Sequence, residues 1–129
     1  MAALEDSVSL TSGKKRRRPA PGGGRWPPSR AHLERLIKEA TVDAYGESEQ
    51  RSGFLCMLEE KLGLPFEARV LGVAVIVEGV DLTPAEEIVA VCRRGRERQA
   101  IPILDLPLPS PRPPGTEWIE AYRHWANRH

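Results

Sequence analysis

The residues with the clearest chemical potential are three acids in the short segment 43–50 (DAYGESEQ), namely Asp43, Glu47 and Glu49, with Gly46 among them. Calcium takes about six to eight oxygen ligands from carboxylates, backbone carbonyls and water. Crowded carboxylates repel one another, and a bound cation relieves that repulsion. The glycine interrupts regular structure, so that backbone carbonyls can also turn toward an ion. The segment is therefore a candidate calcium site.

The spacing of these acids is not that of an EF-hand. Counted from Asp43 as the first position, the third residue is Tyr45, where an EF-hand loop needs an oxygen ligand. The sixth residue is Ser48 and the twelfth is Phe54, where the loop needs glycine and glutamate. A calcium site in this segment is therefore of another kind.

Other acidic pairs occur at Glu59-Glu60 and at residues 86–87. On residue type alone, adjacent acids are typical of a solvated surface, and the same holds for the three acids of segment 43–50. As metal ligands, Glu59 and Glu60 would complete the site from the helix that follows the segment, with Asp81 as a weaker option. Which acids meet in space is left open by the sequence.

Catalytic and zinc-binding patterns are absent from the sequence. The three histidines, His32, His124 and His129, have no serine or cysteine nucleophile in a matched local motif. The two cysteines, Cys56 and Cys92, form no CxxC and no Cys/His cluster. Both stand in apolar stretches, which predicts buried thiols in a reducing cytoplasm. We expect a protein that is not an enzyme.

Charge is distributed unevenly along the chain. Residues 1–30 hold seven basic and two acidic residues, whereas residues 31–92 hold twelve acidic and five basic ones. Such an acidic domain is a poor partner for nucleic acid, because phosphate affinity comes from lysine and arginine. The longest uncharged apolar run, 70–77, has eight residues, and a membrane span needs about 20. We expect neither a nucleic-acid partner nor a membrane.

Composition divides the 129 residues into two parts. Residues 1–28 are rich in glycine, proline and basic residues, which predicts a disordered basic tail. Residues 29–129 are long enough for a single domain. No secretory signal is recognisable at the N-terminus, so we expect a cytoplasmic protein.

Helical periodicity marks residues 30–44 and 48–62, and an aromatic stripe of Trp118, Ile119, Tyr122 and Trp125 marks a C-terminal helix. Strands are predicted over 67–77, 88–93 and 99–104, with turns at Gly79, 81–84 and Gly95. Pro102 lacks a backbone donor, so the third strand is expected at an edge of the sheet or at a bulge. The expected fold is α+β: N-terminal helices, then a small antiparallel SH3-like barrel or meander, then a C-terminal helix that docks on the barrel.

The run 43–72 resembles a small bacterial calcium-binding family, the CcbP type. The matching residues are Asp43, Ala44, Tyr45, Glu47, Glu49, Gln50, Leu58, Glu59, Glu60, Leu62, Pro65, Phe66 and Ala68. The similarity covers residues 40–78 well and extends loosely to 104. It implies calcium binding without an EF-hand, on a mainly β domain with helices.

The sequence departs from that family at Gly46 and Ser48, which stand where acids are expected in the more calcium-competent members. Fewer carboxylates lower the affinity for calcium. The leading hypothesis is thus a weak cytoplasmic calcium buffer or sensor whose partner is the ion. The alternative is an interaction module, without a metal site, that contacts protein or nucleic acid through a small barrel and the arginine cluster at 93–98.

Overall fold

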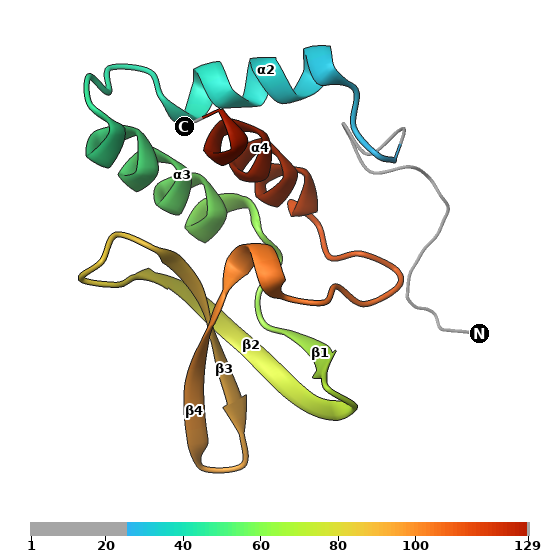
Figure 1. Cartoon of the computed structure of the whole chain (residues 1–129). Coiled ribbons are helices and arrows are strands. Elements are labelled where there is room, and N and C mark those ends of the chain that lie inside the picture. Colours follow the sequence, from blue (N-terminus) through green and yellow to red (C-terminus); the bar gives the residue numbers. More distant parts are fainter. Residues whose placement is uncertain (1–25, 129) are drawn as a thin grey trace.

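The computed structural model describes residues 26–128, and the predicted tail up to residue 25 lies outside them. The elements follow in the order α2 (Arg30–Ala40), α3 (Glu47–Lys61), β1 (Phe66–Val70), β2 (Val73–Leu82), β3 (Ile88–Arg94), β4 (Glu97–Pro102), the short 3-10 helix η1 (Ile103–Asp105) and α4 (Thr116–Asn127). The three α-helices of residues 26–128 gather at one end of the molecule, and the strands extend away from them (Figure 1). The fold is therefore α+β, as predicted.

The first helix begins where the sequence predicts and ends earlier. The Ser29 hydroxyl accepts a hydrogen bond from the His32 amide at 3.1 Å, which caps the N-terminus of α2. The helix ends at Ala40, four residues before the predicted end, because the C-cap residue Thr41 leaves helical geometry with φ of −105° and ψ of 12°. Asp43, two residues later, has a left-handed backbone with φ of 62°. Gly46 then precedes α3 in an extended conformation. A loop of six residues thus separates α2 from α3.

The predicted single strand over 67–77 is wrong. Residues 66–82 form a hairpin, in which β1 pairs antiparallel with β2. Leu71 and Gly72 make the turn, with φ of 52° and 80°. Two positive φ values suit a two-residue hairpin, but leucine is not a residue that signals such a turn. Its side chain is 97% exposed.

Gly79 is likewise not a turn. It lies inside β2, where the register with β3 shifts between Val77 and Gly79, so the glycine marks a β-bulge. The strand continues to Leu82, and the turn to β3 follows it. The hairpin at Gly95 is confirmed, and the strand after it, β4, lies at the edge of the sheet as predicted. This strand begins at Glu97 and ends at Pro102, whereas the sequence predicts it over 99–104.

The sheet is a four-stranded antiparallel meander in the order β1-β2-β3-β4, and it does not close as a barrel. Closure would require pairing between β1 and β4, and none occurs within residues 26–128. The first strand has only five residues, and Pro102 at the end of β4 lacks a backbone donor before the chain turns into η1. Of the two expected alternatives, the antiparallel meander is confirmed and the SH3-like barrel is wrong.

The aromatic stripe of α4 is buried, as predicted, but it docks mainly on the helices. α4 lies between α2 and α3 and contacts η1 (Figure 1). The rings of Tyr122 and Trp125 lie 5.5 Å and 5.4 Å from the ring of Phe54 on α3. These aromatic pairs fix the C-terminal helix against the start of the domain.

The two cysteines differ in environment. Cys92 on β3 is buried as predicted, whereas Cys56 on α3 is exposed, which corrects the expectation of two buried thiols. Phe54 and Leu58 stand one turn apart and face the core. Cys56, two residues from each, is turned by about 200° around the helix and faces solvent.

Candidate metal centre

The three acids of segment 43–50 lie in the α2–α3 loop and the first turn of α3, and all are exposed. Asp43 stands in the loop with its left-handed backbone. Glu47 and Glu49 occupy the first helical turn, where the positive end of the helix dipole stabilises carboxylates. The sequence therefore brings these acids to one corner of the molecule, on the solvent side.

One of these carboxylates already has a local role. Oε1 of Glu49 accepts a hydrogen bond from the backbone amide of Tyr45 at 2.8 Å. Gly46 has no side chain to cap the helix, so Glu49 reaches back across the N-terminus instead. The bond stabilises the turn that joins the loop to α3, and it holds the Glu49 side chain over that turn.

A second carboxylate, that of Glu47, faces an arginine. Nη2 of Arg51 lies 3.8 Å from Oε1 of Glu47, one helical turn away. Nη1 of the same guanidinium donates to Oε1 of Glu86 at 3.0 Å. Glu86 comes from the turn between β2 and β3, 35 residues further along the chain. Sequence reasoning assigned it no role, because only its pairing with Glu87 was visible.

The start of α3 is tied to the C-terminal helix. Nε1 of Trp125 donates a hydrogen bond to Oε1 of Gln50 at 2.8 Å. The Arg51 guanidinium lies 5.2 Å from the centre of the same indole ring. Trp125 is 1% exposed, so this part of the acidic segment rests on the aromatic core.

The remaining predicted ligands lie elsewhere. Glu59 and Glu60 are exposed near the C-terminal end of α3. At about 1.5 Å of rise per residue, Glu59 is about 18 Å along the helix axis from Glu47. Asp81 lies in β2, where its carboxylate accepts the amide of Leu82 at 2.8 Å. The structure thus does not bring Glu59 and Glu60 to the 43–50 segment.

Within residues 26–128, no three histidine, cysteine, aspartate or glutamate side chains converge on a point where they could hold a metal ion. Calcium requires about six to eight oxygens, so the side chains as they stand form no ready cage. The acids of segment 43–50 are exposed and lie in a loop and a helix end. A site there requires the side chains to turn toward a common ion, with water supplying the remaining ligands.

The arginine cluster of the β3–β4 hairpin is partly neutralised. Nε of Arg93 lies 2.6 Å from Oε2 of Glu78, and Nε of Arg98 lies 2.9 Å from Oε1 of the same residue. These bonds, that from Arg93 first, hold the pKa of the Glu78 carboxyl below its ordinary value. Arg94 and Arg96 have no ion pair with any residue in the described range. Half of the cluster is therefore engaged inside the protein.

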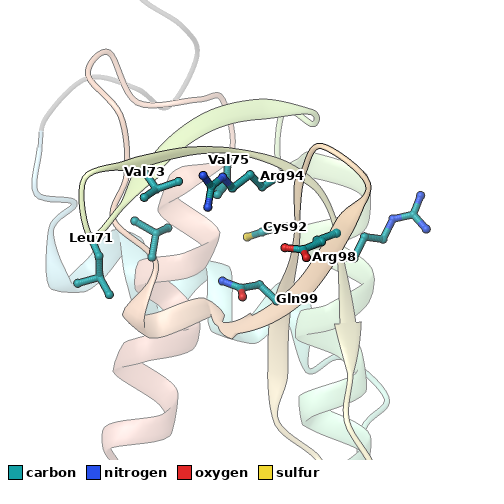
Figure 2. Close-up of a pocket in the computed structure, with 9 residues that line it drawn as sticks. Leu71, Val73, Val75, Cys92, Arg94, Arg98 and Gln99 are labelled. Carbon is teal, nitrogen blue, oxygen red and sulfur yellow. The ribbon is translucent and has the colours of Figure 1, made fainter.

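A cavity of about 540 Å³ lies between residues of the β1–β2 hairpin and residues of the β3–β4 hairpin. Val73, Val75 and Cys92 supply apolar lining, and Arg94 and Gln99 supply polar groups. Figure 2 shows Arg94 over the hollow and the Arg98 side chain pointing away from it. Burial raises the pKa of the Cys92 thiol. No acid proposed as a metal ligand lines this cavity.

The model of the CcbP family, described as calcium binding, matches residues 34–126, from α2 to the end of α4. Searches of curated proteins and of solved structures found no significant match. None of the helices between residues 26 and 128 is long and apolar enough to cross a membrane.

Proposed function

We propose that this chain, which belongs to the CcbP calcium-binding family, binds calcium weakly through Asp43, Glu47 and Glu49 and serves as a cytoplasmic calcium buffer or sensor. The family is one of calcium-binding proteins and not of enzymes. One observation supports this location. The three acids are exposed in the α2–α3 loop and the first turn of α3, inside the residues that the family model matches.

Weak binding is expected from the number and state of the ligands. The segment offers three carboxylates, of which Glu49 holds the Tyr45 amide and Glu47 faces Arg51. Gly46 and Ser48 add none. Calcium must therefore draw these side chains from existing contacts and keep several waters. We expect a Kd between about 10⁻⁵ and 10⁻³ M, weaker than that of calcium sensors, because affinity falls with the number of charged ligands.

Calorimetric titration of the full chain with calcium tests the proposal, with magnesium as the control ion. Magnesium should bind less, because it dehydrates reluctantly. The triple change Asp43→Asn, Glu47→Gln, Glu49→Gln should abolish the calcium heat. The matched control, Glu59→Gln with Glu60→Gln, removes two acids from the other end of α3 and should leave it unchanged.

Each outcome assigns the site. If the heat persists in the triple variant and disappears in the double variant, calcium binds at Glu59 and Glu60, and the proposed location is wrong. If the wild type gives no heat at 10 mM calcium, about 10 times the weakest Kd expected, the proposed function is wrong.

Thermal unfolding gives an independent measure. An ion that binds only the native state stabilises it by about 2.7 kcal/mol when its concentration is a hundred times Kd. Millimolar calcium should therefore raise the Tm of the wild type and not that of the triple variant. A chelator should reverse the rise, and moderate salt should not.

The interaction module remains the second candidate, and the cavity beneath Arg94 is the observation that favours it. Binding of an acidic partner to Arg94 and Arg96 would weaken steeply with salt, unlike calcium binding. The bonds of Arg93 and Arg98 to Glu78 count against a phosphate grip by the whole cluster.

Residues 29–129 are proposed to fold as one domain without the basic tail. The Arg112 guanidinium lies 4.0 Å from the centre of the Trp26 ring, so the chain just before the boundary already contacts the domain. Deletion of residues 1–27 should leave a single cooperative unfolding transition. A loss of cooperativity would move the boundary toward the N-terminus.

A further inference from the structure

Arg51 stands between two carboxylates that come from different parts of the fold. Its guanidinium contacts Glu86 at 3.0 Å and Glu47 at 3.8 Å. One acid belongs to the first turn of α3 and the other to the β2–β3 turn. The guanidinium thus holds the position that a cation shared by these two carboxylates would take.

The Trp125 ring holds the Arg51 side chain in place. That side chain is 19% exposed, and its guanidinium lies over the Trp125 ring. The indole is itself held by the bond to Gln50 and by the ring of Phe54. Arg51 is therefore not a freely moving surface side chain, and its charge stays close to the acidic segment.

Glu86 is fixed as well. Its backbone has a φ of 65°, in the left-handed region that glutamate rarely adopts. Its amide donates to the Thr83 carbonyl at 2.8 Å, and the Glu87 amide donates to the Thr83 hydroxyl at 3.0 Å. These bonds stabilise the turn that presents the Glu86 carboxylate to α3.

We propose that Arg51 is an internal counter-ion that competes with calcium for Glu47, and that Glu86 is a further carboxylate available to the ion once the guanidinium is withdrawn. The inference rests on the proposed function and adds a residue that sets the affinity of the site for calcium. In the wild type, an ion at Glu47 must displace a fixed positive charge or bind beside it.

The size of the effect follows from the charges. A unit positive charge a few ångströms from a divalent ion opposes it by about 1–2 kcal/mol in a water-like dielectric, which is about tenfold in Kd. Removal of the guanidinium also frees two carboxylates. We expect Arg51→Gln to bind calcium at least about tenfold more tightly than the wild type, and Arg51→Lys to stay near the wild type.

Terbium luminescence in the full chain measures the competition directly, because terbium takes the same oxygen ligands and is excited through a nearby tyrosine. Tyr45 is 88% exposed and lies between Asp43 and Glu47. Calcium displaces the terbium and yields its own Kd. The Trp125 ring, 5.2 Å from the Arg51 guanidinium, also sensitises terbium, so Tyr45→Phe should reduce the emission without abolishing it and without changing the Kd for calcium.

Two further variants complete the comparison. Arg51→Met removes the charge and keeps a long side chain over Trp125, so it replaces Arg51→Gln if that variant unfolds. Arg69→Gln is the matched control, since it removes one exposed arginine charge from β1. The Arg69 guanidinium donates to the Gly72 carbonyl in the β1–β2 turn. The Kd of this variant should differ from the wild type by less than about twofold at moderate salt.

The outcomes separate the two proposals. If the wild type binds and Arg51→Gln and Arg51→Met bind no more tightly, the counter-ion role is wrong and the proposed function stands. If those variants bind calcium and the wild type does not, the counter-ion role stands, and the proposal that the natural chain binds calcium is wrong. If neither binds, both proposals are wrong.

Discussion

Gly53 is the position at which ordinary helix propensity and tertiary packing make opposite predictions. It lies in the interior of α3, where replacing glycine by alanine stabilises an exposed helix by about 1 kcal/mol. A Cβ at Gly53, however, would overlap the carbonyl oxygen of Ala40 and lie 3.2 Å from its carbonyl carbon. The glycine therefore lets α3 pass close to the C-terminal end of α2.

The magnitude follows from what has to move. The overlapping atom belongs to the backbone, so no side chain can turn aside, and α2 must shift relative to α3. Overpacking costs about 1–3 kcal/mol or more, and a backbone clash belongs at the upper end. After subtraction of the gain in propensity, Gly53→Ala should destabilise the domain by about 2 kcal/mol, or lower Tm by about ten degrees.

Urea unfolding with circular dichroism measures the change, and Gly46→Ala is the matched control. A Cβ at Gly46 meets no atom within 4 Å, and its φ of −125° suits any residue. That variant should lose less than about 1 kcal/mol, the cost of a poorer N-cap. If Gly53→Ala is as stable as the wild type or more so, the close approach of α2 and α3 is refuted.

Three other perturbations have defined outcomes. Trp125→Ala should lower the free energy of unfolding, measured with a chemical denaturant, by about 3–5 kcal/mol, because the ring is buried against the aromatic core. A loss below about 1 kcal/mol would mean that α4 is not docked. The hydrogen bond from His124 and the charge of Arg128 hold the pKa of the Glu34 carboxyl below its ordinary 4.5. The ionised Glu34 carboxylate therefore contributes fully to the free energy of unfolding above pH 4.5, and this contribution is lost as pH falls through the lowered pKa. The stability advantage of the wild type over Glu34→Gln should shrink below pH 4.5. A difference that stays constant with pH would refute the bond. A thiol reagent should modify exposed Cys56 rapidly and buried Cys92 only on unfolding, and equal rates would contradict their placement.

Local pattern was sufficient for the helices and for most of the sheet. Helix periodicity and the Ser29 cap depend on residues within a few positions of each other, so the sequence alone locates α2, α3 and α4 to within a few residues. Pro102 and Gly95 act on their own backbone, and both predictions about the last strand hold.

Errors arose where a residue adopts a conformation against its usual preference. Leu71 turns with a positive φ and is exposed, although leucine favours neither, so the β1–β2 hairpin was predicted as one strand. Whether the sheet closes depends on pairing between its first and last strands, far apart in the sequence. Such pairing leaves no local signal.

The candidate site shows the same division. Residue types and the family resemblance located the acids of segment 43–50, because those acids are neighbours in sequence. Only the tertiary structure brings Glu86 to Arg51 across 35 residues, and places Gln50 and Arg51 against Trp125 from the far end of the chain. The charge balance of the site depends on these long-range contacts, and spacing along the chain does not encode them.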